Sequence, residues 1–165
     1  MGKEKVIILM DEVIIKGEKI KLMQKILIKK LHKDAKVPFM ATTGSAGFDL
    51  HSMLDCDLIQ GDIHMISTGL AVAIPEGFEM QIRPRSGLAK NGIIVVNSPG
   101  TIDSDYRGEI KILLSILIPH VVYQIKKGER IAQGVIQKVP SIYFEEVEEL
   151  DVTKRGTGGF GHSGK

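Results

Sequence analysis

Short apolar runs, either β-branched or alternating with polar residues, recur along the chain from Met23 onward. Runs of this length predict β-strands, because the side chains of a strand point alternately to its two faces. Turn-forming residues such as Pro75-Glu76-Gly77 and Lys90-Asn91-Gly92 separate the runs at intervals typical of antiparallel sandwiches or barrels. The pattern predicts an all-β fold with strands at Ile26–Ile28, Gly69–Ile74, Phe78–Ile82, Ile93–Val96, Ile110–Leu117 and Ile131–Val139.

One short helix is expected within this β pattern. Ser86 follows Pro84-Arg85 and could cap a turn through Leu88-Ala89-Lys90, because a serine hydroxyl can accept a hydrogen bond from a free backbone amide. We expect one or two helical turns near residues 86–91.

The two ends of the chain differ from this body. Residues 1–22 repeat lysine and glutamate among isoleucines, which fits an extra β-ribbon, a fraying arm or sequence upstream of a start at Met23. The glycine-rich tail has little apolar surface apart from Phe160, so we expect it to be mobile when empty. The expected organisation is an N-terminal extension of unknown role (1–22), a β domain (23–150) and a flexible C-terminal arm (151–165).

The composition fits one packed domain. The chain has 165 residues, 43% hydrophobic and 25% charged, which is ordinary for a globular protein. Its apolar runs are too short for a membrane span, and a net charge of +2 with scattered lysines forms no basic groove. We therefore expect neither membrane nor nucleic-acid binding. The single cysteine, Cys56, cannot form a disulfide within the chain, which favours a structural role and a cytoplasmic location.

The segment Pro84-Arg85-Ser86-Gly87 carries the first candidate chemistry. It places a guanidinium, a hydroxyl and backbone amides at the start of the expected helix, where amides and the helix dipole favour anions. Glycine at 87 would let a phosphate oxygen approach the backbone closely. The alternative is an ordinary capped turn with a surface arginine, and the segment alone does not decide between them.

A polar stretch from Asn97 to Glu109 joins two apolar strands and is long for a simple hairpin. Such loops often carry function. Asp103 could orient and deprotonate a water, and Tyr106 could present its ring to a sugar. Alternatively, the acids of this stretch cap turns and Tyr106 packs against the sheet.

Two further polar residues stand at or within expected strands. Asp49 enters an apolar strand just after Thr42-Thr43-Gly44-Ser45, where it could hold a metal-bound water or bond a neighbouring backbone amide. Gln133 could point into a site or simply be solvated.

Several familiar catalytic patterns are missing from the sequence. It has no Gly-Lys-Ser phosphate loop and no Gly-x-Ser-x-Gly nucleophile elbow. A single cysteine and five histidines without paired spacing give no zinc signature. These gaps argue against covalent serine chemistry and against a zinc enzyme.

Considered together, five segments resemble the five motifs of the trimeric dUTPase family. Each is weak alone, but their order and spacing make the combination specific. The resemblance implies a distorted jelly-roll or β-clip-type barrel that forms homotrimers, with active sites shared between subunits and a C-terminal arm that closes over a neighbour's site. The segments are AGFDL (46–50), PRSG (84–87), GTIDSDYRGE (100–109), GERIAQ (128–133) and RGTGGFGHSG (155–164).

The resemblance also implies the reaction. This is hydrolysis of dUTP to dUMP and pyrophosphate, which keeps uracil out of DNA and supplies dUMP for thymidylate synthesis. Asp103 would be the general base that aligns a water for attack on the α-phosphorus. Mg²⁺ held mainly by the triphosphate would offset the developing charge, with Asp49 reaching it through water. The groups implied to hold the phosphates are Arg85, Ser86, Gly87, Gln133 and Arg155.

Base and sugar selection are implied for the hairpin and the arm. Tyr106 would pack under the deoxyribose and exclude a 2′-hydroxyl, and Phe160 would stack on the uracil as the arm closes. Fixed donors and acceptors would reject cytosine, which presents the opposite pattern at the same edge. The residues implied to match the uracil edge are Asn97, Gly100, Thr101, Ile102 and Lys111.

One departure and two alternatives accompany the resemblance. Ser115–Tyr123 is more apolar than expected for a surface loop of this family, so we expect it to face a subunit interface. A dCTP deaminase, or a bifunctional deaminase and diphosphatase, would share the fold and part of the phosphate site, but the GGFG tail and TIDSDY segment argue against it. A non-catalytic nucleotide-sensing regulator is a further alternative, although the presence of Asp103 argues against that as the only role.

Overall fold

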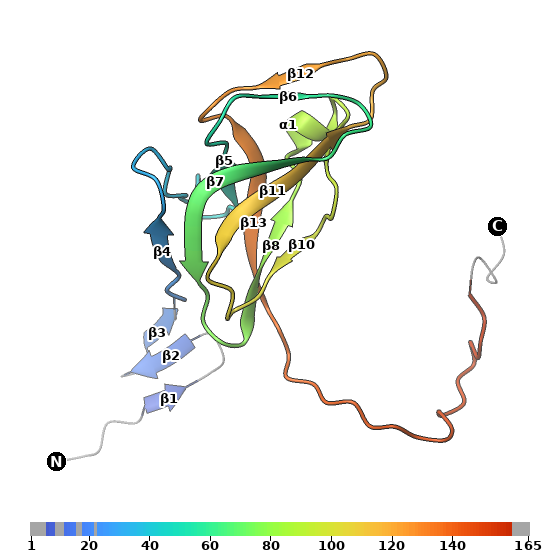
Figure 1. Ribbon diagram of the computed structural model, residues 1–165. Helices are drawn as coiled ribbons and strands as arrows, with labels where there is room; N and C mark the ends of the chain where they lie inside the picture. Colours follow the sequence, from blue (N-terminus) through green and yellow to red (C-terminus); the bar gives the residue numbers. More distant parts are fainter. Residues whose placement is uncertain (1–5, 9–11, 16–17, 22, 160–165) are drawn as a thin grey trace.

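The computed structural model describes residues 6–8, 12–15, 18–21 and 23–159, and Figure 1 shows a β body with a long extended C-terminal segment. The strands and the helix follow the chain in this order: β1 (Val6–Ile8), β2 (Glu12–Ile15), β3 (Glu18–Lys21), β4 (Leu27–Lys30), β5 (Phe48–His51), β6 (Cys56–Leu58), β7 (His64–Ala73), β8 (Phe78–Arg83), α1 (Ser86–Ala89), β9 (Ile93–Val95), β10 (Gly100–Ile102), β11 (Glu109–Ile116), β12 (Tyr123–Ile125) and β13 (Arg130–Lys138).

Two four-stranded sheets build the body. One has the strand order β10-β8-β13-β5 and the other the order β4-β7-β11-β9. The strand pairs of both sheets are antiparallel, and β12 and β6 add a separate two-stranded ribbon. Consecutive strands repeatedly alternate between the sheets, which gives the jelly-roll-like architecture predicted for the chain.

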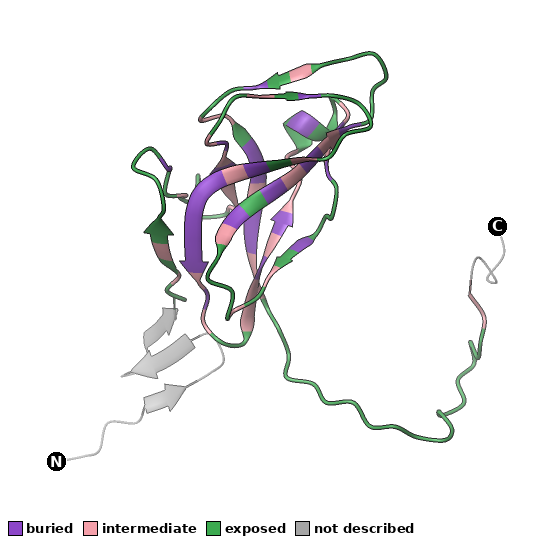
Figure 2. Ribbon diagram, viewed as in Figure 1, coloured by how far each residue is buried: buried purple, intermediate pink, exposed green. Residues whose placement is uncertain are grey.

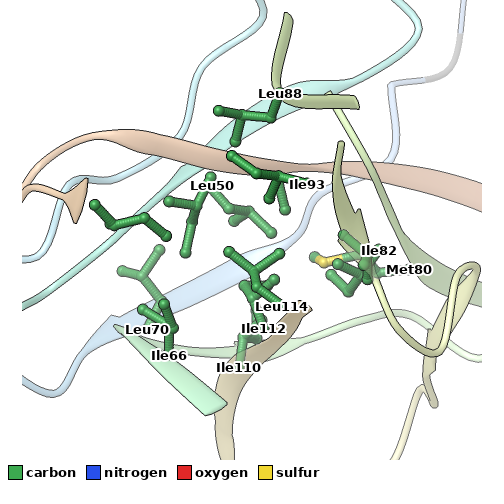
Figure 3. Packing of buried hydrophobic residues seen from close by; sticks show 14 of the residues in the cluster. Leu50, Ile66, Leu70, Met80, Ile82, Leu88, Ile93, Ile110, Ile112 and Leu114 are labelled. Carbon is green, nitrogen blue, oxygen red and sulfur yellow. The ribbon is translucent and has the colours of Figure 1, made fainter. Parts of the chain in front are cut away.

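The core lies between the two sheets and consists of aliphatic side chains (Figure 3). On β11, every second residue from Ile110 to Ile116 is buried, as expected for a strand with one face on the core. Met80 and Ile82 of β8 bring the opposite sheet to the same core. Each fully buried side chain of this size contributes about 1.5–3 kcal/mol relative to its exposed state, so the core holds the two sheets together. Its buried residues lie along the strands of the body (purple in Figure 2).

The six predicted strands all occur, with small differences at their ends. The strand expected at Gly69–Ile74 is longer and begins at His64, because alternation continues through His64, Ile66 and Thr68. The segment around Asp49 is a strand, β5, as its apolar neighbours suggested. The pattern did not indicate β6, β10 and β12, each of which has only three residues.

The helix α1 is present, but its predicted cap is wrong. Ser86 is the first helical residue, and Arg85 occupies the N-cap position in an extended conformation with no side-chain capping bond. Leu88 anchors α1 through its buried side chain. No side-chain hydroxyl of the N-cap residue therefore accepts a hydrogen bond from the amides at the helix start. Ser86 and Gly87 are exposed.

The N-terminal segment contains an antiparallel ribbon in the order β1-β2-β3, which matches the first of the three interpretations of residues 1–22. At the other end, the chain leaves the body after β13, and residues 140–157 are exposed (Figure 2). Among the described residues, no helix has the length and apolar character needed to cross a membrane.

Candidate functional site

The predicted site residues fall into two groups in the structure. We call the first the α1 cluster, and it comprises Asp49, Arg85, Ser86, Gly87 and Gln133. The second, the β10 cluster, comprises Asn97, Gly100, Thr101, Ile102, Asp103, Tyr106 and Lys111. The α1 cluster lies where β8 leads into α1, and the β10 cluster lies on and around β10, which pairs with β8 from Met80 to Ile82.

The α1 cluster is built on one row of residues across three adjacent strands. Asp49 of β5 lies directly opposite Gln133 of β13, and Gln133 lies opposite Arg83 of β8. Directly paired residues in antiparallel strands share a face, so these side chains project on the same side of the sheet. The Gln133 amide donates to the Pro84 carbonyl oxygen at 2.9 Å, which ties β13 to the residue before Arg85.

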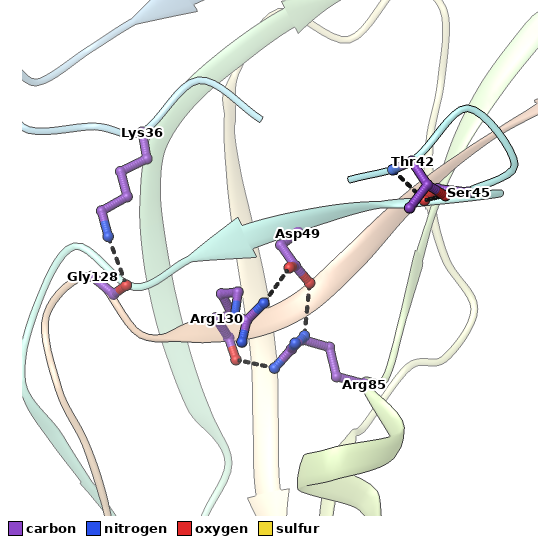
Figure 4. A network of polar contacts seen from close by, with 7 residues as sticks. All are labelled: Lys36, Thr42, Ser45, Asp49, Arg85, Gly128 and Arg130. Atoms are coloured by element: carbon purple, nitrogen blue, oxygen red, sulfur yellow. Dashed lines mark hydrogen bonds and ion pairs between the residues drawn. The ribbon is translucent and has the colours of Figure 1, made fainter. Parts of the chain in front are cut away.

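Asp49 forms the centre of an ion-pair network (Figure 4). The Arg85 Nε donates to Asp49 Oδ1 at 2.7 Å, and Arg130 Nη1 donates to Asp49 Oδ2 at 3.3 Å. Arg85 Nη1 also donates to the Arg130 carbonyl oxygen at 3.3 Å. The alternative in which Asp49 bonds a neighbouring backbone amide is therefore not the arrangement observed, because two arginines occupy its oxygens.

Gly87 leaves open space at the start of α1. A Cβ atom built at this position would meet no atom within 4 Å, since the residue is exposed. The fold itself therefore does not require glycine here. An anion that approaches the helix start would instead need this space beside the backbone amides of Ser86 and Gly87.

Two other glycines have a packing role beneath the cluster. A Cβ atom at Gly47 would lie 2.9 Å from Gln133 Oε1 and 3.0 Å from the Gly134 carbonyl oxygen. At Gly134, a Cβ atom would meet the ring of Phe48. Both glycines therefore allow β5 to lie close to β13, and this closeness brings Asp49 level with Gln133.

His51 stands beside this network on β5, opposite Arg130. Burial lowers the pKa of the His51 imidazole, and the nearby positive charge of Lys36 lowers it further. Its buried Nδ1 has no hydrogen-bond partner. The ring is therefore neutral near pH 7 and lines a small pocket of about 230 Å³ together with Asp49 and Arg130.

The β10 cluster begins at a buried glycine. A Cβ atom at Gly100 would lie 3.0 Å from Asn97 Nδ2, so the absence of a side chain lets the Asn97 amide lie against the strand. Thr101 and Lys111 are exposed and Ile102 is half-buried.

The polar stretch was named a hairpin, but β10 and β11 on its two sides do not pair with each other among the described residues. In the described part of the chain, β10 pairs with β8, whereas β11 pairs with β7 and β9. The connection from β10 to β11 therefore crosses from one sheet to the other, and the polar stretch is long because it spans this crossing.

Asp103 and Tyr106 lie in that crossing. Asp103 is exposed and borders a groove of about 810 Å³, with Glu79 and Arg107 among the other lining residues. Tyr106 lies against Gly108, and its hydroxyl donates to the Glu109 carbonyl oxygen at 3.0 Å. The tyrosine ring thus packs on its own loop while 42% of the residue remains exposed.

Asp103 and Arg85 lie toward opposite ends of β8 within one chain. Ile102 lies opposite Met80 near the beginning of β8, whereas Arg85 follows the end of that strand. Glu79, which shares the groove with Asp103, lies six positions before Arg85, and fully extended chain of that length spans at most about 20 Å. One chain therefore does not bring Asp103 to the phosphate-binding groups predicted around Arg85.

Arg155 also lies away from both clusters. It sits in a turn of the extended C-terminal segment, where its Nε donates to the Gly158 carbonyl oxygen at 2.8 Å. Residues on the way to this turn expose large apolar side chains, with Phe144 93% and Leu150 85% exposed. Phe160 lies outside the described residues.

The described residues contain no group of three or more histidine, cysteine, aspartate or glutamate side chains arranged to hold a metal ion. Asp49 is the carboxylate of the α1 cluster. A single carboxylate fits Mg²⁺, which usually keeps several waters and binds proteins through one or two carboxylates together with substrate phosphates.

Cys56 belongs to neither cluster. Burial raises the pKa of its thiol, and the charge of Asp57 raises it further. Its sulfur lies 3.6 Å from His64 Nδ1. The protonated, partly buried thiol agrees with the structural role expected for it.

Arg130 is the member of the ion-pair network that the sequence analysis did not single out. Strict alternation places residues 130 and 133 on opposite faces of a strand, so the pattern does not group Arg130 with Gln133. A register shift between Arg130 and Ala132 reverses this expectation.

The chain is similar to known proteins over most of its length. A family model described as dUTPase matches residues 33–164. The deoxyuridine 5'-triphosphate nucleotidohydrolase of Nautilia profundicola is 56% identical over 142 residues, which cover 86% of this chain and 99% of that protein. The protein of the same name from Wolinella succinogenes is 51% identical, with 86% and 95% covered.

Solved structures give the same result for the fold. The dUTPase of Staphylococcus bacteriophage 80alpha, solved with dUPNHPP, has a TM-score of 0.77 and 29% sequence identity. The match covers 87% of this chain and 100% of the phage chain.

Proposed function

This chain belongs to the dUTPase family, and from this membership we propose how its residues hydrolyse dUTP to dUMP and pyrophosphate. The enzyme is a dUTP diphosphatase, which acts on an acid anhydride. The assignment of residues rests on one observation in this chain, the separation of Asp103 in the β10 cluster from Arg85 in the α1 cluster. Each cluster suits one end of the nucleotide.

The α1 cluster fits the triphosphate. Arg85 can donate charge-assisted hydrogen bonds to phosphate oxygens, and the exposed amides of Ser86 and Gly87 can donate further ones. The Gln133 amide group faces the same side of the sheet as Asp49. These groups hold the phosphates in one orientation, so that a water can attack in line with the leaving pyrophosphate.

Asp103 is the general base in this proposal. Its exposed carboxylate accepts a proton from the water that attacks the α-phosphorus, and the bond from that phosphorus to the bridging oxygen of pyrophosphate breaks. No residue of the chain becomes covalently attached to the substrate, in agreement with the missing nucleophile elbow.

Magnesium supplies positive charge when bound with the triphosphate, and this charge stabilises the negative charge that develops on the phosphates. Asp49 is the residue that would contact the hydrated ion. It does so through water, because the cluster offers one carboxylate, too few ligands for a cage built from protein alone.

A homotrimer would unite the parts. Since Asp103 follows Ile102, which pairs near the beginning of β8, and Arg85 follows the end of β8, we infer that a site with both draws them from different subunits. The extended segment supports a third contribution, because its exposed apolar side chains, such as Phe144, call for a surface on another copy. The exposed Leu117 and Val122 of the apolar stretch fit the same expectation of an interface.

The β10 cluster would select the base and the sugar. The Asn97 amide and the backbone around Gly100 are held by close packing, so they present fixed donors and acceptors to uracil. Cytosine would leave some of these groups unsatisfied, which is costly in a closed site. Tyr106 would face the deoxyribose, and Phe160 of the arm would cover the base.

Steady-state hydrolysis of dUTP, compared with dTTP, dCTP and UTP in magnesium buffer, tests the function directly. We expect pyrophosphate release from dUTP to exceed that from the other three by at least about a hundredfold in kcat/KM, as for sites that discriminate through hydrogen bonds. Ammonia release from dCTP would identify a deaminase and contradict the proposal.

The role of Asp103 has its own test. We expect Asp103→Asn to lower kcat by about 10²–10⁴-fold, the usual contribution of general-base catalysis. Binding of a non-hydrolysable α,β-imido analogue of dUTP, measured by calorimetry, should stay within a few-fold of wild type. Undiminished turnover in the variant would show that another group activates the water.

A further inference from the structure

The Asp49 carboxylate is shared between two arginines, one on each oxygen. Arg85 holds Oδ1 at 2.7 Å and Arg130 holds Oδ2 at 3.3 Å (Figure 4). The two arginines differ in their surroundings, because the Arg85 side chain is 25% exposed and the Arg130 side chain 59%. They come from two segments of the chain that meet only in the fold.

A β-bulge puts Arg130 in this position. Arg130 pairs with His51 and Ala132 pairs with Leu50, so β13 uses two steps where β5 uses one. Ile131 and Ala132 are both buried, as expected when a bulge interrupts alternation. Without the extra residue, Arg130 would face the core side with Ala132, away from Asp49.

Arg85 has two partners in this structure, and phosphate would compete with them for its N–H donors. In this structure its Nε is committed to Asp49, and its Nη1 is committed to the Arg130 carbonyl oxygen. Under the proposed function, Arg85 also binds phosphate. As Arg85 turns toward phosphate, Asp49 loses its closer cation and lies beside a triphosphate that remains a net anion even with one Mg²⁺, which is an unfavourable arrangement for a carboxylate.

We propose that Arg130 is a positioning residue of the dUTPase site, which keeps the Asp49 carboxylate compensated and oriented while Arg85 transfers from Asp49 to the triphosphate. This inference rests on the proposed function. Arg130 holds Oδ2 throughout, and the departure of Arg85 frees Oδ1 on the side of the substrate. Arg130 therefore acts through Asp49 and not by touching the nucleotide.

A double-mutant cycle separates these two modes of action. Calorimetry would give the Kd of the α,β-imido dUTP analogue, in magnesium buffer, for the full-length wild type, Arg130→Gln, Asp49→Asn and the double variant. We expect Arg130→Gln to raise Kd about tenfold in the wild-type background and less than about twofold in the Asp49→Asn background. A tenfold rise in both backgrounds would overturn the proposal, because Arg130 would then act on phosphate directly.

Two controls complete the experiment. Lys126→Gln removes one positive charge from an exposed residue of the turn just before β13, and we expect it to change Kd less than about twofold. Arg130→Lys retains the charge and should recover part of the affinity that Arg130→Gln loses. An unchanged Kd in Arg130→Gln, or an equal loss in Lys126→Gln, would contradict the proposal.

Folding and function are checked independently of the cycle. Arg130 is largely exposed, so we expect its variants to keep the wild-type Tm within a few degrees. Hydrolysis of dUTP by the wild-type chain tests the proposed function on its own. If the wild type hydrolyses dUTP but the effects of Arg130→Gln and Asp49→Asn on Kd are additive, only the role of Arg130 is rejected.

Discussion

Gly87 is a residue at which folding and ligand binding make different demands. The chain leaves open space around its Cα, so among the described residues a methyl group would meet no atom within 4 Å beyond its own neighbours in the chain and helix. Alanine also favours helix over glycine by about 0.5–1 kcal/mol. We therefore expect Gly87→Ala to keep or slightly raise Tm, while KM for dUTP rises about tenfold because the methyl group occupies the path of a phosphate oxygen.

Gly44→Ala is the matched control for this change. Gly44 is also exposed and has no atom within 4 Å of a built Cβ, but it lies outside the α1 cluster. Its kinetics should match those of the wild type. A normal KM in Gly87→Ala would mean that phosphate does not approach this backbone.

Individual residues were predictable where a motif carried them. Arg85 and Gln133 were expected together from the resemblance, and the structure places both beside Asp49, with Gln133 bonded to Pro84. Arg130 was not predictable, because the bulge that turns it toward Asp49 leaves no mark in the alternation of polar and apolar residues. Its role depends on one extra residue in a strand, which only the three-dimensional register shows.

At the scale of elements, the close approach of β5 to β13 depends on Gly47. A methyl group there would lie 2.9 Å from Gln133 Oε1 and 3.0 Å from the Gly134 backbone. The strand backbone cannot easily yield, so we expect Gly47→Ala to lower the free energy of unfolding by about 1–3 kcal/mol. Thermal or urea unfolding measures this loss.

Gly44→Ala is the control for Gly47→Ala, because it adds the same methyl group at a nearby position. Gly44→Ala, three residues earlier, should alter the free energy of unfolding by less than about 0.5 kcal/mol, because it meets no neighbour. Equal losses in both variants would show that chain flexibility before β5, and not the spacing of β5 and β13, sets the stability.

The longer strands were predictable because each buries a regular apolar face. Every second residue of β11 from Ile110 is buried, and this period is visible in the sequence. The strands β6 and β12 are three residues long and offer too few positions to display a period. The cap of α1 was predicted at Ser86 but is at Arg85. Arg85 is extended there and forms no side-chain capping bond.

At the scale of the whole molecule, subunit sharing predicts rescue between two inactive proteins. Asp103→Asn chains keep their arm, and chains that end at Lys154 keep Asp103. In a trimer that contains both variants, about one third of the sites would combine an intact Asp103 with an intact arm from another subunit. We expect co-expressed, doubly tagged trimers to recover roughly that fraction of wild-type turnover.

Each parent protein serves as the control. The truncated chain should fold with the Tm of the wild type, because the described residues of the arm are mostly exposed, yet its turnover should be close to that of Asp103→Asn. Verified mixed trimers without added activity would contradict an arm contributed by a neighbour.

The order of the motifs along the chain does not show how the site is assembled. Asp103 and Arg85 are close in sequence, but β8 and its pairing with β10 carry them to opposite ends of one sheet. The family resemblance predicted from the sequence which residues take part. It could not show their separation within one chain, because that depends on which strands pair.

The extended segment after β13 has a consequence for the life of a newly made subunit. Ile142, Tyr143 and Phe144 follow one another with at least 71% of each residue exposed, next to the acidic Glu145 and Glu146. Unprotected backbone of this kind is where proteases cut first, whereas contact with a neighbouring copy would shield it. Subunits made in excess of their partners would therefore be the ones degraded, so assembly itself would act as quality control on the amount of enzyme.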